Sequence, residues 1–266
     1  MDMSTVCLNN YPIHPEGIMP GTMGAGKYEI RFARDAEELD AVLALRYRVF
    51  NLELGEGLEA SVETERDLDE YDPYCHHLMV CLRNSGEVIG TYRMQTREMA
   101  RDGHGFYSSG EYDLSSFGDA VLDDAVEIGR ACIDKAHRNG RVLFMLFKGL
   151  VKYLIHNNKN YMFGCCSITS QDPQEGLQVY ELLKQQGHVH EQYNVLPQEG
   201  FECELSPMTV PMCPDVKIPQ LMRIYFMYQA KICSPPAIDR LFKTIDYMTL
   251  VDIRNFDEKT ARGFTN

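Results

Sequence analysis

The stretch VEIGRACI, residues 126–133, decides the fold, because it is an apolar strand pattern interrupted by two charged side chains. In a regular strand, Glu127 and Arg130 would lie on opposite faces of a sheet. Gly129 between them allows a bulge, which would bring both to one face and leave a backbone N–H unpaired. Such an N–H stabilises the oxyanion of acyl transfer. The stretch therefore predicts a strand that lines a site or carries a structural ion network.

Outward from this strand, the sequence predicts one domain with a mixed sheet. Strands are expected at about 28–32, 76–83, 87–95, 125–133, 161–167 and 247–253. Helices are expected after Asp35 and over about 140–156, 174–186 and 219–232, with a loop-rich stretch at 97–124. The central strand–helix–strand order indicates an α/β sheet that is partly antiparallel and partly parallel. We expect residues 1–27 to be an irregular lead-in, 28–254 the domain and 255–266 a tail.

Composition and charge exclude several classes of protein. The chain has 266 residues, 26 Lys and Arg against 39 Asp and Glu, and a net charge of −13, which disfavours a nucleic-acid-binding protein. The nine cysteines show no C-x-x-C spacing, so neither a disulfide framework nor a zinc ribbon is expected. Residues 1–26 lack Lys and Arg, and no apolar run reaches the ~18 residues of a membrane span. We therefore expect a cytoplasmic protein without a signal peptide.

Three local patterns are less specific than they first look. GTMGAGKY, residues 21–28, matches a P-loop except that Tyr28 replaces the Ser or Thr that holds magnesium, which favours a linker. The histidines in 75–77 and 188–190 lack a partner cluster at metal-ligand spacing, so no metal site is expected. The adjacent cysteines at 165–166 lie in an apolar strand, where cysteine usually packs as a small apolar side chain rather than acting as a nucleophile.

Buried charge is the next signal. Arg46 lies on the apolar stripe of the helix after Asp35, where an unpaired guanidinium would be costly to bury. It needs an anionic partner, and the acidic stretch ETERDLDEYD, residues 63–72, offers several, although alone that stretch favours a solvated loop. Arg93 interrupts the strand at 87–95 in the same way. We therefore expect these charges to meet in one network.

Several basic residues follow the predicted strand at 125–133. Arg138 and Arg141 surround the start of the helix at 140–156, and Lys148 and Lys152 lie four residues apart on one face of it. A helix N-terminus with free N–H groups and arginines is typical of a phosphate site. The alternative is an ordinary solvated helix face.

Several segments together resemble known families. The strand, arginine loop and helix at 126–156 resemble motif A of the GNAT acyltransferases, with RNGRV at 138–142 in place of the usual Gln/Arg-x-x-Gly-x-Gly/Ala. RYRVF at 46–50, DEYD at 69–72, Arg93 after GTY, and EIGR at 127–130 resemble the acyl-homoserine-lactone synthases. GFYSSGEYDL at 105–114, MFGCCS at 162–167, PPAID at 235–239 and FKTIDY at 242–247 resemble the ornithine N-acyltransferases (lyso-ornithine lipid synthases, also labelled hemolysin-like) and the long-chain N-acyl amino acid synthases.

This resemblance implies an α/β, GNAT-like fold, with a mixed, largely antiparallel twisted sheet flanked by helices and a C-terminal helical extension. It implies transfer of a long-chain fatty acyl group, 3-hydroxylated or not, from acyl carrier protein to the amino group of an amino acid such as ornithine. The product would be an N-acyl amino acid or lyso-ornithine lipid. The resemblance implies no tightly bound cofactor, and acyl-phosphopantetheine as co-substrate, on carrier protein in preference to coenzyme A. It also implies a cytoplasmic location with peripheral contact at the inner membrane surface.

Two alternatives stay open. An acyl-homoserine-lactone synthase has the same Arg, Asp and Glu pattern, although the long C-terminal extension fits it less well. A non-catalytic acyl- or carrier-protein-binding protein, including a membrane-active one, would keep the basic residues without needing Glu127.

The resemblance also implies residue roles. Glu127 would take a proton from the acceptor amine, Arg130 would hold the carboxylate of Glu127 or of the acceptor, and Tyr180 would assist departure of the thiolate. Core packing is the alternative for Tyr180. The acceptor pocket is expected to contain Arg46, Asp69, Asp72 and Arg93, with Asp239 or Asp246 facing a side-chain ammonium. Contacts to phosphopantetheine and carrier protein are expected at Ile133, Arg138, Gly140, Arg141, Lys148 and Lys152.

Overall fold

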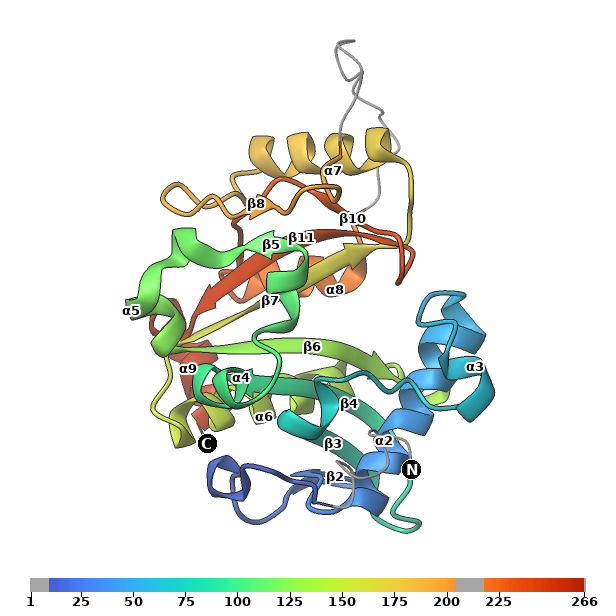
Figure 1. The fold of residues 1–266 in the computed structure, drawn as a ribbon. Helices are drawn as coiled ribbons and strands as arrows, with labels where there is room; N and C mark the ends of the chain where they lie inside the picture. The colour runs from blue at the N-terminus through green and yellow to red at the C-terminus, as the bar shows by residue number, and fades with distance from the viewer. Residues whose placement is uncertain (1–9, 204–217, 266) are drawn as a thin grey trace.

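The computed structural model describes residues 10–203 and 218–265, built around a nine-stranded sheet (Figure 1). Its strands are β1 (Met23–Ala25), β2 (Tyr28–Phe32), β3 (His76–Leu82), β4 (Val88–Thr96), β6 (Ala125–Ile133), β7 (Tyr161–Ile168), β9 (Lys231–Ile232), β10 (Ala237–Asp239) and β11 (Thr244–Asp252). They are ordered β1-β2-β3-β4-β6-β7-β11-β10, and β9 pairs with β11. Among these strands β6 and β7 alone pair in parallel, which confirms the mixed, largely antiparallel sheet. A second sheet pairs β5 (Tyr112–Asp113) with β8 (Leu196–Pro197).

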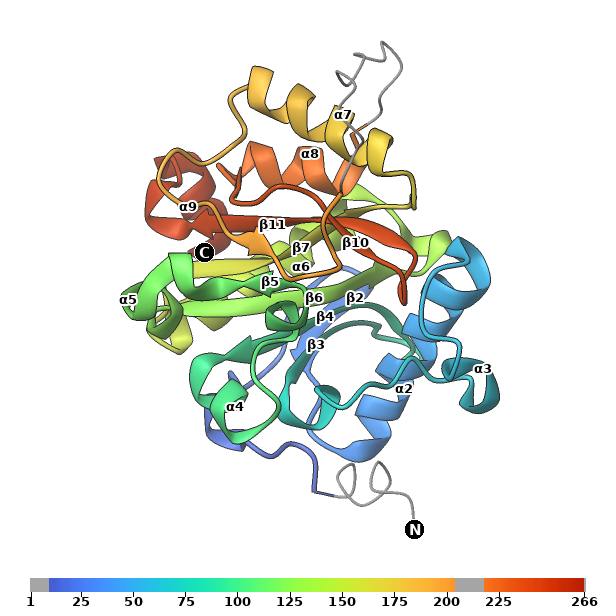
Figure 2. The same cartoon turned by 45° about the horizontal axis from the view of Figure 1, so that its top comes forward.

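Helices flank the sheet. They are α2 (Ala36–Tyr47), α3 (Ser61–Thr64), α4 (Arg97–Asp102), α5 (Gly118–Asp123), α6 (Gly140–His156), α7 (Pro173–Gln185), α8 (Gln220–Met227) and α9 (Glu258–Thr265). Shorter helical turns are η1 (Pro15–Gly17), η2 (Arg48–Leu54), η3 (Asp72–Tyr74), η4 (Tyr107–Gly110), η5 (Leu114–Phe117), η6 (Lys135–His137) and η7 (Ile253–Asn255). Figure 2 shows α7 and α8 at the end of the sheet that carries β10 and β11. No helix in the described part of the chain is both long and apolar enough to cross a bilayer.

The two faces of the sheet carry separate cores. In β3, Leu78 and Val80 pack in the cluster that contains α6, whereas Met79 and Cys81 pack in the cluster that contains α2. This alternation follows from the two-residue period of a strand, so α2 and α6 lie on opposite faces. Gly149 lets α6 approach closely, because a Cβ there would lie 2.6 Å from Leu78 Cδ2.

The parallel pair separates after a few residues. Ala125–Glu127 of β6 pairs with Tyr161–Phe163 of β7, and the register of the described strands ends there. Gly164 follows at the point of divergence, where a Cβ would lie 2.1 Å from the Ile128 carbonyl oxygen. A glycine is therefore required, and beyond it the strands diverge, as Figure 1 shows.

The predicted bulge is confirmed, with a different residue in the unusual conformation. Thr91 of β4 is paired with Cys132 and Arg93 with Gly129, so two residues of β6 face Tyr92. The positive backbone angle belongs to Arg130 (φ 49°) rather than to Gly129. A bulge of this kind redirects side chains at a strand edge.

Some boundaries differ from the expectations. The helix predicted at 219–232 ends at Met227, and Lys231–Ile232 forms β9 instead. The lead-in is only partly irregular, because Met23–Ala25 pairs with β2, and its first nine residues lie outside the described part. The predicted tail forms α9, whose Phe264 is buried and stacks on Phe144 of α6 with ring centroids 5.3 Å apart.

Candidate active site

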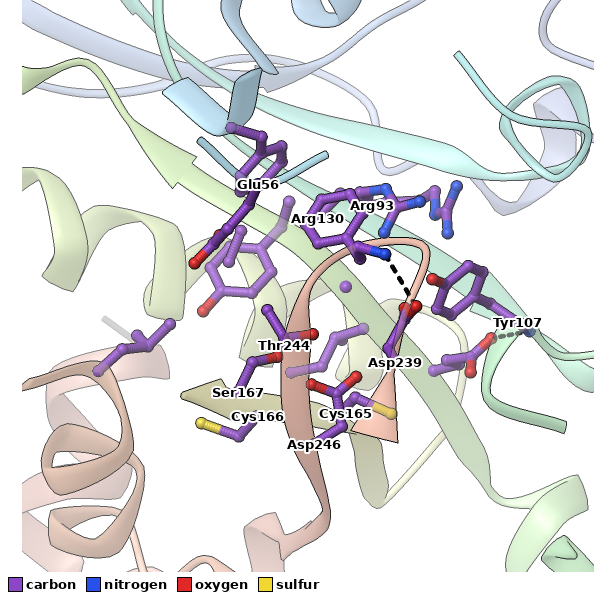
Figure 3. A pocket seen from close by; sticks show the side chains of 18 of the residues that line it. Glu56, Arg93, Tyr107, Arg130, Cys165, Cys166, Ser167, Asp239, Thr244 and Asp246 are labelled. Carbon is purple, nitrogen blue, oxygen red and sulfur yellow. Dashed lines mark hydrogen bonds between the residues drawn. The ribbon is translucent and has the colours of Figure 1, made fainter. Parts of the chain in front are cut away.

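A cavity of about 260 Å³ lies where β6 separates from β7 (Figure 3). Residues 128–131 of β6 form one wall, and residues 165–167 of β7 form the opposite wall. The polar side chains that line it include Glu56, Arg93, Gln95, Tyr107, Glu127, Arg130, Asp239, Thr244 and Asp246. Because β7 does not pair with β6 along this wall, the backbone of β6 faces the cavity rather than a neighbouring strand.

Glu127 is buried in this wall and held by three hydrogen bonds. Its Oε2 accepts the Tyr107 N–H at 2.8 Å, and its Oε1 accepts the Ser108 N–H at 2.8 Å and the Ser108 hydroxyl. Burial raises the pKa of Glu127 above its ordinary value, and the bonds from Ser108 and Tyr107 oppose that rise. A carboxylate with a raised pKa and a fixed orientation is suited to general-base catalysis.

The donors to Glu127 come from the start of η4. The first N–H groups of a helix have no partner within it, so they are available to a carboxylate. Phe106, which precedes η4, is buried and packs edge to face on Phe163 of β7, with centroids 5.0 Å apart. This packing holds η4 beside β6. The GFYSSG segment therefore positions the backbone N–H groups that bind Glu127.

Arg46 lies at the centre of a buried ion network. Its side chain is fully buried, and it donates from Nε to Asp67 at 2.7 Å and from Nη1 to Asp72 at 2.6 Å. The arginines beside Asp72, first Arg46 and then Arg93, hold the pKa of that carboxyl well below its ordinary value. The prediction that Arg46 needs an acidic partner is confirmed, and the acidic stretch supplies two.

Arg93 and Arg130 carry this network to the cavity. Arg93 Nη1 donates to Asp69 at 2.6 Å and to Asp72 at 3.0 Å. Arg130 Nη2 donates to Asp69 at 3.0 Å. The network of Arg46, Arg93, Arg130, Asp67, Asp69 and Asp72 balances three positive against three negative charges, which offsets the cost of burying them.

Aromatic rings cover the two cavity arginines. The Tyr107 ring centre lies 5.1 Å from the Arg93 guanidinium and 4.8 Å from that of Arg130. Phe242 lies on Arg130 at 4.4 Å. Since Tyr107 also donates its N–H to Glu127, one residue joins the ion network to the carboxylate.

A second group of acids lies at the β10–β11 side. Asp239 and Asp246 line the cavity, and Glu111 is buried next to Asp246. Burial and the neighbouring carboxyls raise the pKa of Glu111. Asp239 Oδ1 accepts the N–H groups of Leu241 and Phe242, both at 2.8 Å, so this oxygen caps a turn.

Two buried polar groups of the cavity have unused hydrogen-bonding capacity. Among the described residues, neither polar atom of the Gln95 side-chain amide has a partner, and Arg130 Nε has none either. Asp67 Oδ2 lies 3.5 Å from that Nε without forming a hydrogen bond. A buried polar group without a partner is costly, and it marks a place where a substrate can bind.

Tyr180 is not part of the cavity. It is 9% exposed, packs in the cluster that contains α6, and lies under Lys184 Nζ at 4.3 Å. The structure therefore supports its core-packing alternative. Tyr92 and Tyr225 line the cavity instead, with their hydroxyl oxygens 2.7 Å apart.

The basic residues expected to bind phosphopantetheine lie outside the cavity. The Asn139 side chain accepts the N–H groups of Arg141 and Val142, so these two N–H groups at the start of α6 are not free. Arg138 makes a two-bond ion pair with Glu53, at 2.7 and 3.0 Å, and also donates to the carbonyl of Ile133. Gly140 and Arg141 are exposed, and Lys148 and Lys152 are half-buried on α6.

Sequence reasoning missed Asp67, Gln95, Tyr107, Ser108 and Glu111 as individual site residues. Asp67, Tyr107, Ser108 and Glu111 lay inside stretches that had been singled out, but nothing local showed which side chain would turn inward. Gln95 could have been found from the sequence, because it is a polar residue at the end of the predicted strand at 87–95. The structure shows that this strand is buried along its whole length.

Comparison with known proteins agrees with this geometry. Residues 45–148, which hold the whole ion network and Glu127, match the family model described as "Acetyltransferase (GNAT) domain". The L-ornithine N(alpha)-acyltransferase of Agrobacterium fabrum is 27% identical over 93% of this chain and 90% of its own length. That of Rhodobacter capsulatus is 28% identical over 90% and 95%. The chain is an N-acyltransferase with the GNAT fold.

A solved structure supports the fold of the acyltransferase. The AHL synthase LasI superposes with a TM-score of 0.50 at 12% identity, over 92% of the acyltransferase and 96% of LasI. At that identity the similarity concerns the fold alone. The cavity where β6 and β7 separate therefore belongs to a GNAT-like sheet.

Proposed function

We propose that this enzyme transfers a long-chain fatty acyl group from the thioester of acyl carrier protein to the α-amino group of ornithine. The acceptor is supported by the names of the full-length relatives. The chemistry is supported by one observation above all: Glu127 lies in the cavity wall, oriented by Tyr107 and Ser108, where β6 leaves β7.

Glu127 is the proposed general base. The α-ammonium of an amino acid must lose a proton before it can attack a thioester. Oε2 of Glu127 accepts the Tyr107 N–H, and a carboxylate oxygen has a further lone pair for a substrate proton or a bridging water. Burial raises the pKa of Glu127, which makes it a stronger base than an exposed glutamate.

The acyl group would enter between the separated strands. The amine nitrogen attacks the thioester carbonyl carbon, and the oxyanion is stabilised by a backbone N–H at Gly129–Arg130. This attack forms the C–N bond, and collapse of the tetrahedral intermediate re-forms the C=O bond as the C–S bond breaks. The nitrogen loses its second proton, and the departing thiolate takes up a proton. The products are the amide and a thiol, with one proton released overall.

Arg130 is the proposed anchor for the carboxylate of the acceptor. Its Nε has no hydrogen-bond partner, and its Nη2 is held by Asp69. The Arg46 part of the network then acts as a rigid support. This arrangement would orient the α-amine of ornithine toward Glu127.

The donor is proposed to dock near α6. Carrier proteins are acidic, and Arg141, Lys148 and Lys152 give this acidic enzyme a local positive charge. Arg138, which is paired with Glu53, contributes less to this positive charge.

We also propose a cytoplasmic location. Because the product is an amphiphile, the enzyme would make peripheral contact with the inner membrane.

The test is an acyl-transfer assay with purified protein. Ornithine is incubated with acyl carrier protein bearing a long-chain acyl group, or with the same acyl group on coenzyme A, and the products are identified by mass spectrometry. Glu127→Gln, which keeps the side-chain shape, is expected to lower kcat by ~10²–10⁴-fold. Full activity of this variant would overturn the role of Glu127, and absence of N-acylornithine with either donor would overturn the proposed function.

A further inference from the structure

The acid group at the β10–β11 side contains a buried acceptor that has no donor. Asp246 is 4% exposed and lines the cavity, and its Oδ1 has no hydrogen-bond partner among the described residues. Thr244 Oγ1, two residues earlier on β11, is also without one. Figure 3 shows Asp246 beside Thr244, Ser167 and Cys165. An unsatisfied carboxylate oxygen in this position marks a place for a ligand donor.

Glu111 makes the place strongly acidic. It is 4% exposed, and its carboxylate, the Asp246 carboxylate and the Cys165 sulfur have ligand atoms within 4.8 Å of one another. Asp239, at the end of β10, adds a third carboxyl to the same side of the cavity. Arg130 is a cation that acts on Glu111, and its Nη2 is held by Asp69. A cationic ligand bound among these carboxyls would favour their ionised forms and offset their mutual repulsion.

We propose that Glu111 and Asp246 bind the side-chain ammonium of the acceptor, and so make the enzyme specific for a diamino acid. An ammonium carries three donors and no acceptor, which matches a group of oxygens with free capacity. This inference rests on the proposed function, because it requires an amino acid in the cavity. The Arg130 guanidinium and the Glu111–Asp246 pair would then fix the two ends of the acceptor, with the α-amine between them.

Asp239 has a secondary part in this pocket. Its Oδ1 already caps the turn after β10, so only Oδ2 is available to a ligand. Asp246, by contrast, lies within a strand that is paired on both sides, opposite Ser167 of β7 and Ala237 of β10. Its position is therefore fixed by two neighbouring strands rather than by a turn.

The experiment compares ornithine with norvaline, which has the same carbon chain without the terminal amine. Steady-state kcat/KM is measured for both acceptors with one acyl donor, in the wild-type protein and in Asp246→Asn and Glu111→Gln. The wild type is expected to prefer ornithine by at least ~30-fold, and each variant is expected to lose that preference because its kcat/KM falls far more for ornithine than for norvaline. Glu63→Gln, an exposed carboxylate on α3, is the control for loss of one charge.

Each outcome has one meaning. Turnover of norvaline by a variant shows that it is folded and that catalysis is intact. An unchanged preference for ornithine in both variants, or an equal loss with both acceptors, would overturn the proposal. If EDTA abolishes the wild-type preference, the three ligand atoms hold a metal ion and the ammonium assignment is wrong. If the wild type acylates neither acceptor, it is the proposed function that fails.

Discussion

Ser108 donates both its backbone N–H and its hydroxyl to the same oxygen, Oε1, of Glu127. The two donors favour the ionised carboxylate and so limit the rise in pKa that burial causes. The pKa of Glu127 is thereby lower than burial alone would make it.

Ser108→Ala removes the hydroxyl and leaves the N–H. We expect the pKa of Glu127 to rise further, so that the acid side of the pH profile of kcat/KM shifts to higher pH. Ser109→Ala is the matched control, because the Ser109 hydroxyl binds the Phe106 carbonyl instead. A profile that does not move in Ser108→Ala, or moves equally in both variants, would contradict the role of the hydroxyl.

Arg46→Met is expected to be strongly destabilising. It leaves Asp67 and Asp72 buried without their main cation, and breaking a buried pair in this way costs ~3–5 kcal/mol. The free energy of unfolding, measured by urea denaturation, gives the effect. Arg66→Met is the control, because it breaks the more exposed pair between Arg66 and Asp40 and should change stability far less. Similar losses in both variants would contradict the importance of burial.

His77 gives the fold a pH dependence of predictable sign. Burial lowers its pKa from 6.5 to about 4, so between these values the unfolded chain binds a proton that the folded chain does not. Stability from this site is therefore complete above pH 6.5 and is lost as the pH falls toward 4, at up to ~1.4 kcal/mol per pH unit.

His77→Gln isolates this contribution. The glutamine cannot titrate, and its amide can still donate to the Asp72 carbonyl that His77 Nε2 contacts at 3.1 Å. As the pH is lowered from 7 to 4, the free energy of unfolding should fall more steeply in the wild type than in the variant. Parallel curves would show that His77 is not neutral in the folded state.

Reversing the charges of Lys148 and Lys152 to Glu tests the docking surface for the donor. We expect the KM for acyl carrier protein to rise, with the KM for ornithine unchanged, because these residues lie on α6 and not in the cavity. Lys184→Glu with Lys231→Glu makes the same change in net charge elsewhere. An unchanged KM for carrier protein, or an equal rise in the control, would place docking on another surface.

Sequence patterns predicted the individual strands and helices and the pairing of one buried charge. The bounds of β6 and α6 followed from long apolar patterns and the Asn139 cap. The pairing of Arg46 with the acidic stretch followed from the cost of burying an unpaired charge. In these cases the residue types of one or two stretches carried enough information.

Contacts between distant segments were not predictable in the same way. Asp246 lies near Cys165 because β11 pairs with β7, a register that no local pattern specifies, and Glu111 reaches them from the segment between η4 and β5. The expected role of Tyr180 rests on the usual place of a tyrosine in related helices, whereas in the structure Tyr180 packs in the core and does not line the cavity. The helix at 220–227 ended early because residues 231–232 are used by the sheet.

The close contact between Gly164 and the Ile128 carbonyl has a wider consequence. Any larger residue at 164 would push β7 away from β6 directly after the last pair of their ladder, where the two strands begin to diverge. The separation of the two strands beside the cavity is thus governed by one missing methyl group. Enlarging position 164 is, for that reason, a direct way to change which chain shapes the enzyme admits.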